Sequence, residues 1–458
     1  MKSMEGKIVY NKATLEKIIL LFFLIISILT MSGFSQNVWN NLNPESCAWK
    51  NVGTEGFVAF TAKYSSLAMS PLNEPYVAYS DGQNYAKAKV KKFDGNNWIT
   101  VGSEGFSNAR ADYINLAFNP TDSLPYVVYE DWSQSYKTTV MKFDGANWVN
   151  VGNIGFSSGA CANTSIAFSS GGDPYVAYTD YGNGGKVSVM RFDGNAWIYV
   201  GNPGFSPAYA EYTNIAFSPS GEPHVAFACG DSAKACVMKF TGTQWTKVGS
   251  GWASWFWTRY SSLTFSPTGI PYLAFGDAYG QYVEKASVKK FNGTSWEYVG
   301  PSIFSQDQVD NIDLVFSPSG ELYVAFGDAK ATVMKFNGTK WIYVGEPNLS
   351  PGDAFYTNLA FNDNGTPFLS YVSYLTSNHL FVKSFDSVNV NVQNILEPDL
   401  MIYPNPAENT VVIDFKDLPD INRCIELYDA QGKKSLNPIL LMINVRLMFE
   451  ITLQECTS

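Results

Sequence analysis

Residues 113–131 read YINLAFNPTDSLPYVVYED, and residues 212–230 read YTNIAFSPSGEPHVAFACG. In the first stretch the apolar side chains of Ile114, Leu116 and Phe118 occupy every second position. This period of two is that of a β-strand, in which successive side chains point to opposite faces. The connectors NPTDSLP and SPSGEP are rich in residues that form tight turns. Each stretch therefore predicts two antiparallel strands joined as a hairpin.

The hairpin belongs to a repeat that runs through most of the chain. Each copy continues with a segment ending in V-M-K-F or a close variant, and then with W-x-x-V-G. Seven tryptophans mark this last segment at intervals of 45 to 51 residues, namely Trp49, Trp98, Trp148, Trp197, Trp245, Trp296 and Trp341. A period of that length is typical of propellers and solenoids. Four antiparallel strands per repeat, without a helical segment, indicate one blade of a β-propeller.

The number of blades follows from the number of first strands. These begin near Tyr64, Tyr113, Asn163, Tyr212, Tyr260, Asn311 and Tyr356. The chain enters the repeat with an isolated strand at Trp49 and leaves it at Asp386 without a following tryptophan strand. The strand at Trp49 can complete the last blade, which hides two sheet edges that would otherwise favour aggregation. We therefore predict an all-β fold with a seven-bladed β-propeller of ~49-residue repeats over residues 36–387.

Composition narrows the function classes. The chain has 458 residues, of which 16% are charged and 15% aromatic, so a large core can form. The net charge of −10 disfavours nucleic acid as a partner. The only histidines are His224 and His379, and no Cys/His spacing suggests a metal, so we expect neither metal nor cofactor. Cys229 and Cys236 flank one hairpin and are a candidate disulfide, with two free buried thiols as the alternative.

The N-terminus is typical of an export signal. Lysines precede an uncharged run of 14 residues from Ile18 to Met31, which is shorter than the ~20 that a membrane-spanning helix needs. Gly33 and Ser35 supply the small residues required for cleavage before Gln36. We predict a signal peptide over residues 1–35 and no membrane span in the mature chain, with a retained anchor as the alternative.

One rim of the predicted propeller has the features of a binding surface. The loops joining the second strand to the third, and the fourth strand to the next blade, vary between copies and are rich in aromatic residues. Flat rings beside a few polar groups suit stacking on sugars. The predicted ligand-binding residues are Trp132, Tyr136, Trp252, Trp255, Trp257, Arg259, Tyr279 and Tyr282. The alternative is packing between blades, which we expect for the recurrent Phe57, Phe106, Phe156 and Phe205.

Charged residues on the same rim leave a role in catalysis open. A glycoside hydrolase needs two carboxyl groups at a suitable separation, and the carboxylates near the mouth are Asp112, Glu211, Asp310 and Asp313. No residue is assigned as catalytic. We predict a secreted or cell-surface module that binds a glycan, another extracellular polymer or a protein. A glycan-degrading hydrolase or lyase is the alternative, and a scaffold without a ligand is the third.

A second pattern pairs acids with lysines at the loops between the second and third strands. Aspartates open five of these loops, and lysines close them: Asp81 with Lys87, Asp131 with Lys137, Asp180 with Lys186, Asp277 with Lys285, and Asp328 with Lys330. In the last blade both are replaced together, by Ser373 and His379. We therefore predict that each pair meets across its hairpin as an ion pair.

The sequence pattern changes after the repeat. Residues 388–398 form a polar linker, residues 400–415 read LMIYPNPAENTVVIDF, and residues 424–434 read CIELYDAQGKK. The Y-P-N-P and L-Y-D-x-x-G-K motifs resemble the C-terminal sorting domain of the type IX secretion system, a small β-sandwich. The resemblance implies handling by that machinery, and location outside the cell or on the outer-membrane surface of a Gram-negative bacterium.

The resemblance to the sorting domain stops after about residue 434. We expect the domain at 399–458 to be incomplete, because the closing strands of the family are missing. The tail at 444–458 is compatible with a frameshifted reading of those strands. A truncated domain would leave the protein in the periplasm.

Overall fold

The computed structural model describes residues 47–58, 61–278, 284–376 and 378–387, together with five short strands between residues 400 and 450. The chain forms two compact units, one of which is Cys47–Ser387. The predicted signal peptide and linker lie outside the described residues. In the described part of the chain, no helix is long and apolar enough to cross a membrane.

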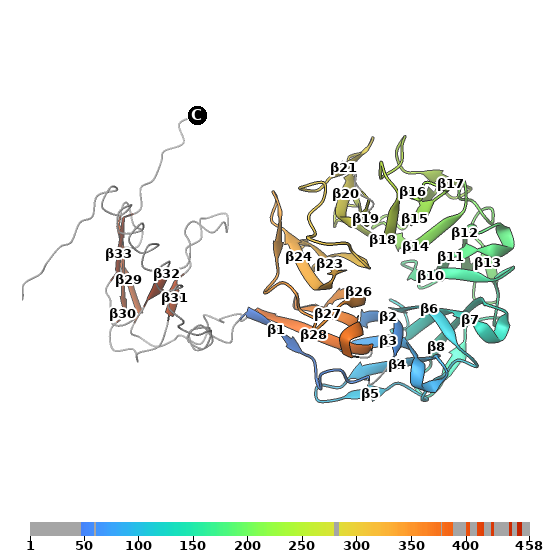
Figure 1. Ribbon diagram of the computed structural model, residues 1–458, viewed down its shortest axis with the longest axis horizontal. Coiled ribbons are helices and arrows are strands. Elements are labelled where there is room, and N and C mark those ends of the chain that lie inside the picture. The colour runs from blue at the N-terminus through green and yellow to red at the C-terminus, as the bar shows by residue number, and fades with distance from the viewer. Residues whose placement is uncertain are drawn as a thin grey trace, which may run out of the picture. The chain divides into compact units, whose positions relative to one another are not determined.

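Residues Cys47–Ser387 form seven four-stranded antiparallel sheets arranged as a ring (Figure 1). Blade one consists of β2 (Ala62–Met69), β3 (Pro75–Asp81), β4 (Lys87–Phe93) and β5 (Trp98–Thr100). Blade two consists of β6 (Ala111–Phe118), β7 (Pro125–Asp131), β8 (Lys137–Phe143) and β9 (Trp148–Asn150). Blade three consists of β10 (Cys161–Phe168), β11 (Pro174–Asp180), β12 (Lys186–Phe192) and β13 (Trp197–Tyr199). Blade four consists of β14 (Ala210–Phe217), β15 (Pro223–Cys229), β16 (Lys234–Phe240) and β17 (Trp245–Lys247).

The remaining blades follow the same order. Blade five consists of β18 (Thr258–Phe265), β19 (Pro271–Asp277), β20 (Lys285–Phe291) and β21 (Trp296–Tyr298). Blade six consists of β22 (Ile312–Phe316), β23 (Leu322–Asp328), β24 (Lys330–Phe336) and β25 (Trp341–Tyr343). Blade seven consists of β26 (Ala354–Phe361), β27 (Pro367–Ser373), β28 (His379–Ser387) and β1 (Cys47–Asn51). Single 3-10 turns follow four second strands, at η1 (Gly82–Asn84), η2 (Trp132–Gln134), η3 (Tyr181–Asn183) and η4 (Tyr374–Thr376).

The predicted closure of the ring is confirmed. β1 pairs antiparallel with β28, and Trp49 lies opposite Phe385. The same register places Trp98 opposite Phe93 in blade one. The N-terminal strand thus occupies the place of the fourth strand in blade seven, and all seven blades have four strands.

Each blade is joined to the next by the tryptophan that marks the repeat. The indole Nε1 of every one of the seven donates to the carbonyl of the Val-Gly valine in the preceding blade, at 2.6 to 3.0 Å. The recurrent phenylalanines stack on the same rings, as Phe106 does on Trp148 at 4.1 Å between centroids. Phe57, Phe106, Phe156 and Phe205 are therefore packing residues, as expected.

A second ring of hydrogen bonds surrounds the axis. One side chain in each first strand accepts a bond from a backbone N–H of the next blade, and Ser66 accepts in this way from Leu116 at 3.0 Å. The acceptors are Ser66, Asn115, Ser165, Asn214, Ser262, Asp313 and Asn358. The indole bonds and the first-strand bonds each form a closed ring of seven, with one bond between each pair of neighbouring blades. Each ring therefore has one bond per blade.

The C-terminal strands form two small antiparallel sheets. The first contains β29 (Leu400–Tyr403), β30 (Thr410–Phe415) and β33 (Leu447–Glu450), and the second contains β31 (Arg423–Ile425) and β32 (Ile439–Leu441). This is an all-β arrangement, as predicted for a sorting domain.

Candidate functional site

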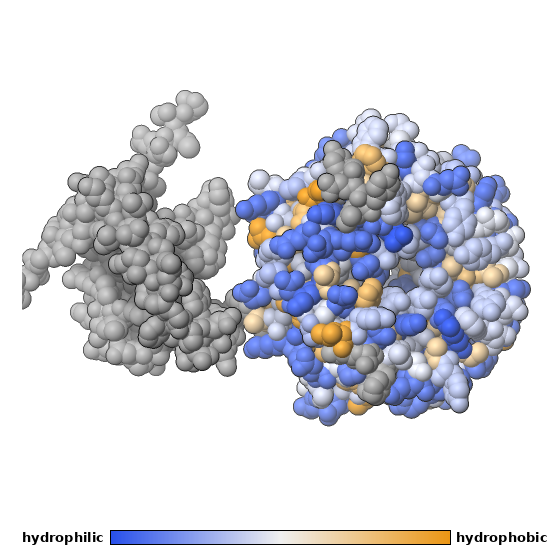
Figure 2. Space-filling model, viewed as in Figure 1, coloured by the Kyte–Doolittle hydropathy of each residue, from blue (hydrophilic) through white to orange (hydrophobic). Residues whose placement is uncertain are grey.

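The loops joining second to third strands, and fourth strands to the next blade, carry most of the exposed aromatic side chains of the propeller. In an antiparallel meander these two sets of loops lie at the same end of the strands. We call this set the aromatic rim: Tyr85, Trp132, Tyr136, Tyr181, Tyr209, Trp252, Trp255, Phe256 and Tyr374. In the view of Figure 2, hydrophilic residues dominate the propeller and hydrophobic ones form scattered spots.

Blade two brings two of the predicted binding residues into contact. The rings of Trp132 and Tyr136 meet edge to face, with centroids 4.8 Å apart. The guanidinium carbon of Arg110 lies 4.1 Å from the centre of the Trp132 ring. Arg110 Nη2 is 2.8 Å from Asp112 Oδ2, and Trp132 Nε1 donates to the same carboxylate at 3.2 Å. A buried carboxylate therefore holds both the cation and the indole in place.

A second buried carboxyl group faces the first. Glu130 is the register partner of Asp112 across the β6–β7 pair, and the two residues are 8% and 4% exposed. Burial, with a further contribution from the charge of Asp112, raises the pKa of Glu130 to about 7. At neutral pH the pair therefore contains one carboxyl group that readily holds a proton beside one that is paired with Arg110.

Blade five places its aromatic residues separately. Trp255 is 74% exposed. Trp252 lies 3.8 Å from the ammonium group of Lys247, and Trp257 lies 5.3 Å from the guanidinium of Arg259. Within the described residues the three tryptophans do not stack on one another. They are therefore separate rings and not one stacked aromatic cluster.

The two remaining predicted residues of blade five, Tyr279 and Tyr282, lie outside the described residues. Arg259 is anchored by a buried partner, since its Nε lies 3.2 Å from Glu284 Oε1. The cation is thereby held in a fixed orientation beside Trp257.

The mouth carboxylates have different roles. Asp313 accepts bonds from the backbone of Leu359 at 2.8 Å and from Ser262 at 3.0 Å, so it belongs to the inner ring of hydrogen bonds. Glu211 accepts a bond from the Tyr209 hydroxyl at 3.0 Å. Asp310 lines the cavity on the axis, and burial raises its pKa. Only Asp112 of this predicted set has a second carboxyl group as its direct cross-strand partner.

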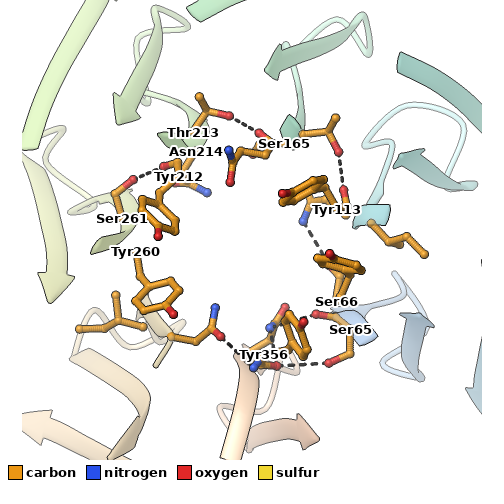
Figure 3. A pocket seen from close by; sticks show the side chains of 18 of the residues that line it. Ser65, Ser66, Tyr113, Ser165, Tyr212, Thr213, Asn214, Tyr260, Ser261 and Tyr356 are labelled. Carbon is orange, nitrogen blue, oxygen red and sulfur yellow. Dashed lines mark hydrogen bonds between the residues drawn. The ribbon is translucent and has the colours of Figure 1, made fainter. Parts of the chain in front are cut away.

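The axial cavity has a volume of about 370 Å³ and is lined by the first strands of all seven blades. Figure 3 shows the rings of Tyr113, Tyr212, Tyr260 and Tyr356 arranged around its open centre. Tyr64, Asn163 and Asn311 occupy the equivalent positions of the other blades. Each blade thus contributes one hydroxyl or one amide group at this level.

The predicted ion pairs between aspartates and lysines are wrong. The residues are register partners, as Asp131 and Lys137 are, but their charged groups form no ion pair in the described part of the chain. Instead Asp131 accepts bonds from the backbone of Ser133 at 2.9 Å and from the Thr139 hydroxyl at 3.0 Å. The carboxylate turns inward because it caps the 3-10 turn that follows it.

The candidate disulfide is also absent. Cys229 and Cys236 are both free and buried. The register pairs Cys229 with Lys234 and Cys236 with Phe227, so the cysteines are diagonal neighbours. Diagonal residues lie about 7–8 Å apart, beyond the usual reach of a disulfide. Burial raises the pKa of Cys236 to about 12, so its thiol stays protonated.

Arg110 and Glu130 were not among the predicted site residues. A signal for Glu130 exists in the repeat, because the equivalent positions of other blades hold small or apolar residues such as Ser80, Thr179 and Ala228. In the described residues, no group of three or more His, Cys, Asp or Glu side chains is placed to hold a metal ion.

Comparison with solved structures finds matches at low sequence identity. A protein of unknown function from Dyadobacter fermentans is 12% identical, with a TM-score of 0.45 over 75% of this chain and 100% of its own. An ulvan lyase of polysaccharide lyase family 25 is 10% identical, with a TM-score of 0.48 over 75% of this chain and 96% of its own. An α-L-arabinanase from Penicillium chrysogenum is 10% identical, with a TM-score of 0.46 over 76% and 100%.

Sequence comparisons identify the C-terminal part. The search of curated proteins found no match to the chain. Residues 401–444 match the family model of the secretion system C-terminal sorting domain. The match contains the predicted Y-P-N-P and L-Y-D-x-x-G-K segments and extends past residue 434. A domain of this kind indicates a secreted or cell-surface protein. The chain thus carries a seven-bladed β-propeller followed in the sequence by a secretion system C-terminal sorting domain.

Proposed function

We propose that this protein is a binding module, exported by the type IX secretion system of a Gram-negative bacterium, that recognises a glycan or another extracellular polymer. The observation that carries the proposal is the aromatic rim. Trp132 and Tyr136 expose 38% and 44% of their surface at one blade, and Trp255 exposes 74% at another. The rings are spread over several blades, which suits an extended ligand better than a compact one.

The energetics favour a role for these rings outside the fold. An aromatic side chain buries ~150–250 Å² when it is covered, which makes it a strong contributor to any interface. The recurrent phenylalanines already fill the spaces between blades, so the rim residues are not needed there. Arg110 and Arg259 supply directed hydrogen-bond donors beside Trp132 and Trp257. Rings flanked by oriented polar groups are suited to sugars, which have apolar faces and polar edges.

A glycan array with the full chain tests the proposal. We expect binding to at least one neutral or acidic polysaccharide. The triple variant Trp252→Ala, Trp255→Ala, Trp257→Ala should weaken it by at least about 30-fold, because truncation of one stacking ring commonly costs ~2 kcal/mol. The matched control is Leu72→Ala with Ile270→Ala, which removes exposed apolar side chains from turns at the opposite end of the strands. Unchanged affinity in the triple variant would assign the rings to no role in binding, and absence of binding by the wild type would favour a scaffold.

A second candidate function, glycan hydrolysis, rests on the Asp112–Glu130 pair. Directly opposed residues of antiparallel strands have Cβ atoms ~4.5–5.5 Å apart, so two carboxyl side chains at such positions can reach the ~5–5.5 Å carboxyl separation of retaining glycosidases. Protonated Glu130 would donate to the glycosidic oxygen while Asp112 bonds to the anomeric carbon and the leaving sugar departs. Water would then displace Asp112 and return a proton to Glu130.

Release of reducing ends from the polysaccharides that bind on the array tests this second function. We expect Glu130→Gln and Asp112→Asn each to lower the rate at least ~100-fold, and the wild-type rate to fall above about pH 7. Glu211→Gln is the control, because Glu211 has the position of Asp112 in blade four but faces Ala228. Binding without any release of reducing ends would exclude hydrolysis and leave the binding function intact.

A further inference from the structure

The axial cavity combines unused hydrogen-bonding groups with an unfavourable backbone. The hydroxyl groups of Tyr113, Tyr212 and Tyr260 have no hydrogen-bond partner among the residues that the structure describes. Three tyrosines in the blade cores differ. The hydroxyl of Tyr129 donates to Met141 Sδ at 3.3 Å, that of Tyr178 to Met190 Sδ at 3.2 Å, and that of Tyr371 to the Leu349 carbonyl at 3.2 Å. The cavity tyrosines are half-buried, so their hydroxyl groups are open to a partner that comes from outside.

The backbone at these positions is held in the left-handed region. Six of the seven equivalent residues have φ between +49° and +56°, namely Tyr64, Tyr113, Asn163, Tyr212, Tyr260 and Tyr356. This region is sparsely populated by bulky residues and favours Gly or Asn. Each of the six sits at a register shift in its first strand, where the strand bulges towards the axis. Asn163 shows that the bulge itself does not require a phenol.

Packing explains the aromatic rings of the cavity tyrosines but not their hydroxyl groups. Tyr64 contacts Tyr113 and Tyr356, with centroids 5.0 and 5.4 Å apart, and Tyr212 contacts Tyr260 at 5.0 Å. Phenylalanine would make the same contacts. The hydroxyl groups are therefore the feature that packing does not explain, and Figure 3 shows those of Tyr113, Tyr212 and Tyr260 at the edge of the open centre.

The lining also defines the chemistry of a ligand. Burial raises the pKa of Tyr64 to about 12, and the pKa values of Tyr113, Tyr212 and Tyr260 are also raised by burial. The phenols therefore stay neutral and can both donate and accept. Among the lining residues that the structure describes, Asp310 is the single charged one. A volume of about 370 Å³ is at the lower end of small-molecule sites, which begin at ~300 Å³. It suits the end of a chain and not its length.

We propose that the axial cavity receives the end of a neutral glycan chain, whose hydroxyl groups hydrogen-bond to Tyr113, Tyr212 and Tyr260. The inference rests on the proposed binding function and deepens it. The aromatic rim holds the body of the polymer, and the cavity distinguishes chain ends from internal segments. Phe355 lines the cavity beside Tyr356, which gives the entering sugar an apolar surface at the mouth.

The test uses the full chain and linear hexasaccharides of β-1,4-glucan, β-1,3-glucan, β-1,4-mannan and β-1,4-xylan, each with free ends and with both ends blocked. Calorimetry should show at least one free hexasaccharide binding at least 10-fold more tightly than its blocked form. The variant Tyr113→Phe, Tyr212→Phe, Tyr260→Phe should abolish that difference. The control Tyr129→Phe with Tyr178→Phe, which removes hydroxyls bonded to Met141 and Met190, should keep it. If the triple variant fails to fold, Tyr212→Phe alone should reduce the preference at least 3-fold.

The remaining outcomes separate the two proposals. Equal binding of free and blocked hexasaccharides, or an unchanged preference in the triple variant, would overturn the cavity site while the rim still binds polymer. A wild-type protein that binds polysaccharides but none of these hexasaccharides would overturn the cavity site in the same way. A protein that binds no polysaccharide and no hexasaccharide would overturn both.

Discussion

At the scale of single residues, Glu130 is the position where blade two departs most clearly from its neighbours. A carboxyl group that is 8% exposed and faces a second buried carboxylate is electrostatically unfavourable. Such sites persist where function offsets the cost in stability. Arg110 and Trp132 both stabilise the charge of Asp112. The charged form of Glu130 is therefore the less favourable of the two.

The pH dependence of unfolding measures how much the buried Glu130 carboxyl group lowers the free energy of unfolding. Its pKa is raised to about 7 in the folded protein against ~4.3 for an ordinary glutamate. The folded state therefore binds the proton more tightly, and stability falls as pH rises through the range between these values. After an allowance for solvent screening we expect a loss of about 2 kcal/mol. Denaturant unfolding at pH 4 and pH 8 should show that Glu130→Gln removes this loss. Glu211→Gln should leave it unchanged, and a Glu130→Gln protein with the wild-type pH dependence would contradict the assignment.

At the scale of elements, the W-x-x-V-G strand is the connector between blades. The valine carbonyl accepts from the next tryptophan, and the glycine that follows lies under the same indole. At Gly152, which has φ +71°, an added Cβ would lie 2.8 Å from Phe192 Cε2 and 3.0 Å from Trp197 Cδ1. Glycine is required here both for the backbone conformation and for the close approach of two blades.

Alanine substitutions at two glycines distinguish the effect of backbone conformation from that of close packing. Gly152→Ala and Gly194→Ala both place alanine at positive φ, but nothing lies within 4 Å of the added Cβ at Gly194. Thermal and denaturant unfolding should show Gly152→Ala to be the less stable by about 1–3 kcal/mol, the cost of overpacking. Equal losses would mean that the contact between blades yields without strain, and that backbone conformation alone selects glycine.

At the scale of the whole molecule, closure is the property on which the other features depend. The outer ring of indole bonds and the inner ring around the axis each pass once through all seven blades. β1 supplies the last member of the outer ring from the opposite end of the sequence, because Trp49 donates to Val344 at 2.7 Å. The axial cavity exists only when both rings are closed, since all seven first strands line it.

A circular permutant tests closure directly. Cys47 and Ser387 are register partners, so Asp386 can be joined to Ala48 by Gly-Asn to give F-D-G-N-A-W, the turn found at residues 192–197. New ends between Gly194 and Asn195 would then leave blade three closed by its own terminal strand. We expect a monomer by size-exclusion chromatography, with a melting midpoint within about 5 °C of residues 47–387 with their natural ends. Aggregation of the permutant would show that blade seven is a special position for closure.

The number of blades, the closing strand and the sorting domain can all be predicted from the residues alone. The reason is that strand period and turn composition are local, and the same local signal appears seven times. The repeat also places Trp132, Tyr136 and Trp255 in loops at one end of the strands, and all three side chains are exposed.

The acid pair and the axial cavity depend instead on the folded molecule. Asp112 meets Glu130 because β6 and β7 pair in one particular register, which shifts between Asp112 and Asn115. The same kind of shift turns the tyrosines towards the axis in five blades, and no periodicity marks it. The aspartates and lysines of the loops show that a correct backbone pairing does not fix the partners of the side chains. They are paired in the backbone as expected, but Asp131 turns to Ser133 and Thr139 because the 3-10 turn offers nearer donors. Side-chain direction is chosen by the whole environment of a residue, and a single sequence carries only its local part.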